Sequence, residues 1–130
     1  MAIALTKVAQ HRFPDGNKLH AIYSAALSGN YATGGYTINN AAFPGGANVF
    51  KQFDNAVVTR KPFNETLNTE YGVSAINNTS TTNPTATLKA YQQATGGVDK
   101  EEYTDGAALA DTVYLEFWGI SAGGIGTTDS

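Results

Sequence analysis

Short runs of alternating apolar and polar residues constrain this chain more than any other feature of its sequence. LHAIYSAAL at residues 19–27 and TVYLEFWGI at 112–120 both alternate, and related runs occupy 70–77 and 85–93. NAVVTR at 55–60 is a further candidate. A period of two places successive side chains on opposite faces of a β-strand. The pattern therefore predicts an all-β protein.

Glycine, asparagine and proline separate these runs, as turns between strands require. Six to eight short strands with such punctuation predict one domain, either a β-sandwich or a jelly-roll-like small barrel. We expect this domain to span residues 18–120. Residues 1–17 are expected to form an extended N-terminal arm, and the glycine-rich residues 121–130 a flexible C-terminal tail. The acidic segment 98–111 is expected to be a loop with at most one short helical turn.

The composition excludes several classes of function. Only 15% of the 130 residues are charged, and the net charge is -3, so the chain offers little attraction to nucleic acid or to anionic lipid. Cysteine is absent, which removes disulfides, thiolate catalysis and sulfur-ligated metals. No apolar run approaches the ~20 residues of a membrane helix, and the N-terminus is a poor signal peptide. We expect a soluble protein made in a cytoplasm.

Residues 29–37, GNYATGGYT, have the glycine spacing of a nucleotide-binding P-loop. Gly35, however, occupies the position of the lysine that would contact the phosphates. The residues that follow do not predict the helix whose N-terminus would face the anion. The alternative, which we favour, is that Gly34 and Gly35 adopt the positive φ angles of a tight turn or bulge.

The remaining polar residues do not predict a catalytic or metal site. His11 and His20 are the only histidines, and a solvated or hydrogen-bonded state is favoured for each. The acidic residues of the 98–111 segment only loosely approach a calcium loop, and Asp105-Gly106 is better explained as a turn. Two acids on one loop are a weak case for glycoside hydrolysis. We therefore expect no enzyme activity, no metal and no cofactor. These acidic residues are Asp99, Glu101, Glu102, Asp105 and Asp111.

The aromatic residues are candidates either for the core or for an interaction surface. Phe50 and Phe117 are expected in the core. Tyr31 and Tyr36 flank the double glycine and are expected to be exposed or to lie in a subunit interface, because amphipathic rings are favoured there. These two tyrosines and Trp118 are also the rings that a carbohydrate-binding module would use for stacking on sugars.

Three segments together resemble small structural proteins of tailed bacteriophages, encoded near the major capsid protein. The first is G-x-Y-x-T-G-G followed by an extended strand, the second a strand containing Lys-x-Tyr before a glycine-rich turn, and the third an acidic, Ala/Gly-containing stretch before a last apolar strand. Together they cover about half the chain, and residues 41–84 take no part. The matching residues are Gly29, Tyr31, Thr33, Gly34 and Gly35, then Leu88, Lys89, Ala90 and Tyr91, then Asp105, Gly106, Leu109, Val113 and Leu115.

The resemblance implies a capsid decoration, or cement, protein located on the virion surface after synthesis in the host cytoplasm. Such proteins are β-sandwiches or barrels that bridge capsid subunits, often as trimers, so the implied partners are the major capsid protein and further copies of this chain. Neither nucleic acid nor membrane is an expected partner. An arm of this kind adds a strand or apolar anchors to a neighbour. The candidate interface residues are Ile3, Leu5, Val8, Phe13, Tyr31 and Tyr36.

Two alternatives remain open at the level of sequence. One is a tail or head-fibre component, and the other is a carbohydrate-binding β-sandwich module. A small hydrolase that uses the acidic segment is the least favoured hypothesis.

Overall fold

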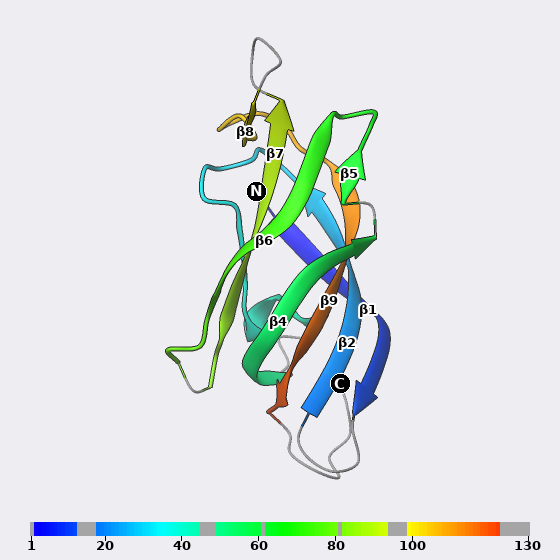
Figure 1. Ribbon diagram of the computed structural model, residues 1–130, viewed down its shortest axis with the longest axis vertical. Helices are drawn as coiled ribbons and strands as arrows, with labels where there is room; N and C mark the ends of the chain where they lie inside the picture. Colours follow the sequence, from blue (N-terminus) through cyan, green and yellow to red (C-terminus); the bar gives the residue numbers. More distant parts are fainter. Residues whose placement is uncertain are drawn as a thin grey trace.

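The chain folds into two antiparallel sheets packed face to face as a β-sandwich (Figure 1). The computed structural model describes residues 2–12, 18–44, 49–60, 62–80, 82–93 and 99–122. Within this part of the chain the strands are β1 (Ala2–Arg12), β2 (Lys18–Ser28), β3 (Tyr36–Ile38), β4 (Phe50–Arg60), β5 (Phe63–Asn64), β6 (Thr69–Asn77), β7 (Thr85–Gln93), β8 (Lys100–Glu102) and β9 (Asp111–Ser121). A 3-10 turn, η1 (Asn40–Ala42), follows β3. The all-β prediction is confirmed, and the fold is the sandwich rather than the closed barrel.

The first sheet has the strand order β1-β2-β9-β4. In strand β2 every second residue from Leu19 to Leu27 is buried, which explains why this alternating segment forms a strand of the sheet. Strand β9 behaves in the same way, with Val113, Leu115 and Phe117 facing the core. The alternation predicted these two strands, and the structure shows which of their two faces points into the core.

The second sheet has the order β3-β7-β6-β5, with β8 also paired to β7. Strand β6 lies along one edge of β7, so β3 and β8 share the other edge, β3 opposite residues 86–88 and β8 opposite 91–93. Sequence reasoning missed β8, because the acidic segment that contains it was expected to be a loop. The described residues of this segment contain no helical turn, which the expectation of at most one allowed, and the expected turn at Asp105-Gly106 is present.

The core between the sheets is dominated by aromatic rings. Phe43, Phe50, Phe53 and Phe117 pack with ring centroids 5.0 to 6.4 Å apart, and Tyr23 lies 4.9 Å from Phe43. Tilted and edge-on arrangements of this kind add to the free energy of burying the rings. Phe50 and Phe117 are fully buried, as expected.

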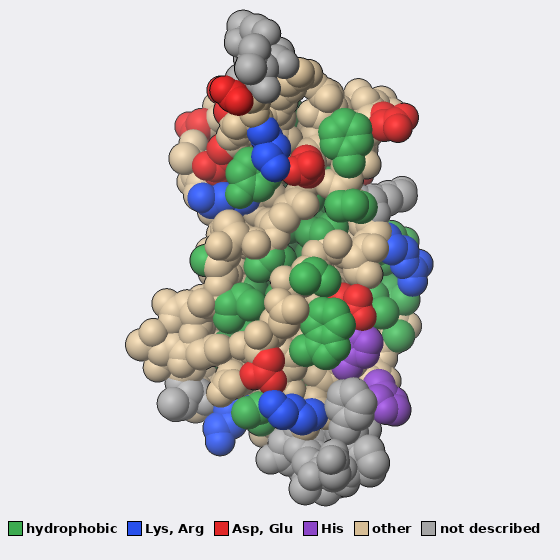
Figure 2. All heavy atoms as spheres, in the orientation of Figure 1, with side chains coloured by type: hydrophobic (Ala, Val, Ile, Leu, Met, Phe, Trp, Pro, Cys, Tyr) green, Lys and Arg blue, Asp and Glu red, His purple; other side chains and the backbone are tan. Residues whose placement is uncertain are grey.

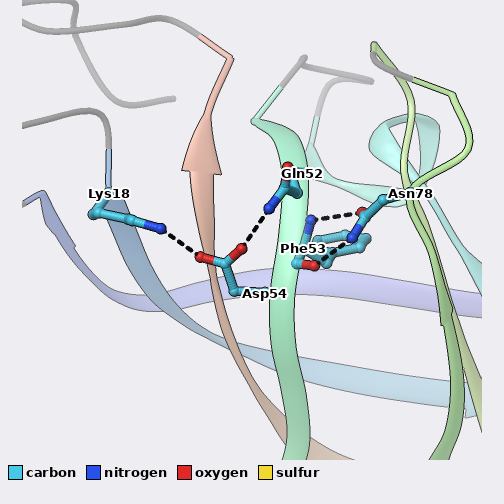
Figure 3. Close-up of polar contacts among 5 residues, drawn as sticks. All are labelled: Lys18, Gln52, Phe53, Asp54 and Asn78. Carbon is cyan, nitrogen blue, oxygen red and sulfur yellow. Dashed lines mark hydrogen bonds and ion pairs between the residues drawn. The ribbon is translucent and has the colours of Figure 1, made fainter.

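Polar contacts hold β4, the edge strand of the first sheet, in place (Figure 3). The side-chain amide of Asn78, in the loop after β6, accepts a hydrogen bond from the Phe53 N–H at 3.0 Å and donates one to the Phe53 carbonyl at 2.7 Å. This amide therefore acts as a one-residue strand partner for β4. On the other side, Asp54 accepts from Lys18 of β2 at 2.8 Å and from Gln52 at 2.6 Å. The Lys18 hydrogen bond is the main cause that lowers the pKa of Asp54 below its ordinary value.

The expected N-terminal arm is largely part of the sandwich. Residues 2–12 form the edge strand β1, which pairs antiparallel with β2 along its length, and Leu5 is buried in the core. The expected domain boundary at residue 18 therefore does not hold for these residues. Ile3 and Leu5, two positions apart, both face the core, as in a strand that has a sheet to pack on. The end of the expected arm, residues 13–17, and most of the expected tail, 123–130, lie outside the described residues.

Candidate interaction surfaces

The GNYATGGYT segment binds the chain's own carboxylates. Gly34 and Gly35 have φ angles of +104° and +83°, which confirms the predicted turn. The Gly34 N–H donates to a carboxylate oxygen of Glu102 at 2.7 Å, and the Thr33 N–H donates to Asp105 at 2.8 Å. These backbone donors, which a phosphate loop would offer to a nucleotide, are already occupied.

Tyr31 completes this arrangement, which we call the Tyr31 latch (Tyr31, Gly34, Ala90 and Glu102). The hydroxyl donates to the same Glu102 oxygen at 2.6 Å and accepts from the Ala90 N–H of β7 at 3.3 Å. The Ala90 carbonyl accepts from the Tyr103 N–H at 2.8 Å. Residue 90 lies in the gap between the β3 and β8 pairings, so Tyr31 replaces a missing strand partner there.

The latch shifts the pKa values of both ionisable groups. Burial, followed by the hydrogen bond to Glu102, raises the pKa of Tyr31 far above its ordinary value of 10.0. The hydrogen bond from Tyr31, followed by that from the Gly34 N–H, lowers the pKa of Glu102 below 4.5. The latch therefore holds a neutral phenol against an ionised carboxylate across the neutral pH range.

The exposure expected for Tyr31 and Tyr36 was wrong. The two residues are 0% and 2% exposed, and their rings pack edge to face with centroids 5.8 Å apart. The Tyr36 hydroxyl is buried, and it has no hydrogen-bond partner among the described residues. The double glycine turns the chain inward at this point, so neither ring is available to stack on a sugar or to contact a subunit at the surface.

The other candidate interface residues lie on or next to β1. Val8 is 46% exposed and is the extra residue of a β-bulge, because the register with β2 shifts between Lys7 and Ala9. Ile3 is partly buried against the core, and Leu5 is 7% exposed. Phe13 lies outside the described residues. Among the three of these residues that the structure describes, only Val8 has an exposed side chain that a neighbouring subunit could contact.

The outer face of the first sheet carries a second group of aromatic and charged side chains. The His20 ring stacks on Trp118 with centroids 4.9 Å apart and planes 7° from parallel, and its Nε2 lies within hydrogen-bond distance of the Glu116 carboxylate. The Arg60 guanidinium lies 4.9 Å from the centre of the Tyr114 ring. Figure 2 shows histidine and hydrophobic side chains side by side toward its lower right. Trp, Tyr and Arg are the residue types that most often dominate binding at protein interfaces.

The acidic residues of segment 98–111 make different structural contacts. Glu102 and Asp105 hold the loop at Gly34, whereas Asp111 accepts hydrogen bonds from Tyr71 at 2.7 Å and Asn64 at 2.9 Å. Burial, followed by the hydrogen bond to Asp111, raises the pKa of Tyr71. The described residues contain no group of three or more His, Cys, Asp or Glu side chains arranged to hold a metal ion. They also contain no helix long and apolar enough to cross a membrane.

A cleft of about 350 Å³ lies where β5, β6, β7 and β8 meet. Sequence reasoning did not single out its aromatic wall, Phe63, or its ion pair, Glu70 with Lys100. The one available signal was the exposed-hairpin pattern FNETLNTE, which places a large apolar residue beside a polar turn.

Comparisons of the chain with protein-family models, with curated proteins and with solved structures find no match. The surfaces described above are therefore the basis on which a function can be assigned.

Proposed function

We propose that the chain is a non-enzymatic structural protein of a tailed-phage particle, which decorates the capsid by pairing the free edge of β1 with a neighbouring capsid subunit. The observation that carries the proposal is the edge itself. β1 has eleven residues and lies at the end of the sheet order, and no described strand pairs with its outer side. The three motifs that resemble small virion proteins support the choice of particle.

Residues 2–6 are the part of this edge best suited to strand addition. They read AIALT, contain no charge and pair regularly with β2, whereas Lys7 and the bulge at Val8 follow directly. Natural proteins use lysine and bulges to prevent edge pairing. Regular edges without such features are where an extended segment of a partner can add as a further strand. The bulge therefore limits the pairing to the first half of β1.

Self-association is assigned to a separate surface, the outer face that carries Trp118 and Tyr114. A trimer held through this face would present several β1 edges at once. Individually weak contacts then produce strong attachment, because the second and third binding events occur within one complex.

Strand addition predicts a sharp difference between two alanines. Ala4 and Ala26 are both exposed, lie opposite each other in the β1–β2 ladder, and differ in that Ala26 belongs to an interior strand. Ala4→Lys should abolish co-sedimentation with particles that lack the protein, whereas Ala26→Lys should bind as the natural chain does. Equal binding of both variants would remove the β1 edge from the proposal.

The particle assignment is tested by mass spectrometry of gradient-purified virions from the virus or prophage that encodes the chain. The chain is expected in the head fraction, at a stoichiometry related to capsid subunits. Recovery in separated tails would favour the tail alternative, and absence from both fractions would contradict the virion assignment altogether.

A further inference from the structure

The cleft at the end of the second sheet is lined by side chains that the strand register places next to one another. Phe63 of β5 lies opposite Glu70 of β6, which lies opposite Tyr91 of β7. Residues directly opposite in antiparallel strands point to the same face of the sheet. The two rings therefore stand on either side of Glu70, and the volume of about 350 Å³ lies within the range of small-ligand pockets, ~300–1,000 Å³.

Lys100 of β8 closes one side of the cleft. Its Nζ lies 2.5 Å from a carboxylate oxygen of Glu70 and 5.2 Å from the centre of the Tyr91 ring. Both contacts hold the ammonium group along the wall. At the upper end of Figure 2, a basic and an acidic side chain lie between hydrophobic ones, over β6 and β7.

Phe63 is the strongest sign that the cleft has a ligand. It is 47% exposed, more than any other large hydrophobic side chain among the described residues. Exposing such a ring forfeits part of the free energy that its burial would contribute. Here the exposed ring faces a cleft instead of lying on a convex surface.

The polar groups of the cleft are suited to hydroxyl groups. Asn68 lines it with a φ of +52°, a conformation that asparagine tolerates better than most residues. Within the described part of the chain, neither the Asn68 amide nor the Asp99 carboxylate has a hydrogen-bond partner. An amide both donates and accepts, and a carboxylate accepts, so together they match the donor and acceptor capacity of a hydroxyl pair.

The charge of the cleft disfavours anionic ligands. Glu70 and Asp99 contribute two negative charges and Lys100 one positive charge, which leaves a net charge of -1. Lys100 is paired with Glu70, whose negative charge offsets the attraction of Lys100 for a phosphate or a carboxylate.

We propose that this cleft binds a neutral saccharide. Phe63 and Tyr91 contact the apolar C–H face of a sugar ring, and Asn68 and Asp99 hydrogen-bond its hydroxyl groups. The site is separate from the β1 edge, and its ligand does not depend on whether the chain decorates a capsid.

The test is a titration that follows backbone amide chemical shifts of the full chain. The probes are maltose, cellobiose, lactose and chitobiose, with sialyllactose as an acidic saccharide and a neutral Gly-Thr-Tyr-Thr-Gly peptide as a non-sugar ligand. At least one neutral disaccharide should shift the amides of Asn68, Tyr91 and Lys100 in a saturable way. Phe63→Ala should weaken that binding by about tenfold or more, equivalent to ~1.4 kcal/mol.

Leu67→Ala is the matched control. Leu67 is 39% exposed, lies in the same β5–β6 turn and does not line the cleft, so this variant should bind as the natural chain does. Thermal unfolding of both variants verifies that the fold is intact. No shift with any neutral disaccharide, shifts with sialyllactose or the peptide alone, or equal weakening by both substitutions would each overturn the proposal.

Discussion

The two ends of β8 make contrasting use of charged residues that lie two positions apart. Glu102 closes the Tyr31 latch, where its partners are a buried phenol and a backbone N–H. Lys100 borders the open cleft, where its partners are an exposed carboxylate and a half-buried ring. Each end combines a tyrosine with a glutamate, yet only the tyrosine of the latch, Tyr31, is fully buried.

The difference follows from the edge of β7 that each end covers. The latch lies in the gap between β3 and β8, where unpaired backbone groups of Ala90 would be buried without Tyr31 and Tyr103. An unpaired buried polar group costs free energy, so the hydrogen bonds at this end serve stability. The cleft lies at the outer end of the sheet, where no such demand exists and side chains remain free for a ligand.

The largest expected effect is at the turn that brings Tyr31 into the latch. A Cβ on Gly35 would lie 2.3 Å from the Leu88 carbonyl oxygen at a φ of +83°, so Gly35→Ala should reduce the free energy of unfolding by about 3 kcal/mol. Gly34→Ala meets no atom within 4 Å and should cost only about 1–2 kcal/mol, from its φ alone. Urea denaturation measures both, and equal losses would show that the close approach to β7 is unimportant.

Removing single hydroxyl groups compares the latch with the cleft directly. Tyr31→Phe leaves the Ala90 N–H and the Glu102 carboxylate without the phenol, and should reduce the free energy of unfolding by about 1–2 kcal/mol. Tyr91→Phe should leave the urea midpoint unchanged, because its hydroxyl has no hydrogen bond within the described residues. If Tyr91→Phe lost more unfolding free energy than Tyr31→Phe, the cleft rather than the latch would be the end that stabilises the fold.

The loss of folding stability at low pH should depend on the latch. The folded pKa of Glu102 is depressed, so its contribution to stability is present above its ordinary value of 4.5 and is lost as the pH falls through the folded pKa. Glu102→Gln should therefore flatten the dependence of the unfolding free energy on pH below about 4.5. Tyr31→Phe should flatten the same region, because it removes the main cause of the shift. An unchanged pH profile in both variants would mean that the hydrogen bond is not made in solution.

The smallest effect is expected at the cleft. Lys100 is exposed, and ion pairs on a surface contribute little to stability. Lys100→Ala should therefore leave the urea midpoint unchanged. A loss comparable to that of Tyr31→Phe would show that the cleft wall is structural.

Local pattern was sufficient for the strands with clear alternation. The alternation at 85–93 predicted β7 with the same limits, and the run at 19–27 lies within β2. Both succeeded because a period of two depends on neighbouring residues alone. Local pattern also predicted the positive φ angles of Gly34 and Gly35.

The candidate sites were harder to predict, because burial depends on partners that are distant in sequence. The sequence predicted an exposed Tyr31 ring. In the structure its hydroxyl bonds to Glu102 and Ala90, which come from two other strands. The cleft combines Phe63, Tyr91 and Lys100 from three strands, and no spacing along the chain relates them.

The amino-acid sequence by itself determined an all-β chain and the positions of several of its main strands, because pleating and turn chemistry are local properties. Only the tertiary structure decided that the N-terminal segment is an edge strand, that β3 and β8 share one edge of β7, and that the GNYATGGYT loop binds carboxylates of its own chain. Those outcomes depend on which strand pairs with which, and pairing is set by packing between residues far apart in the sequence.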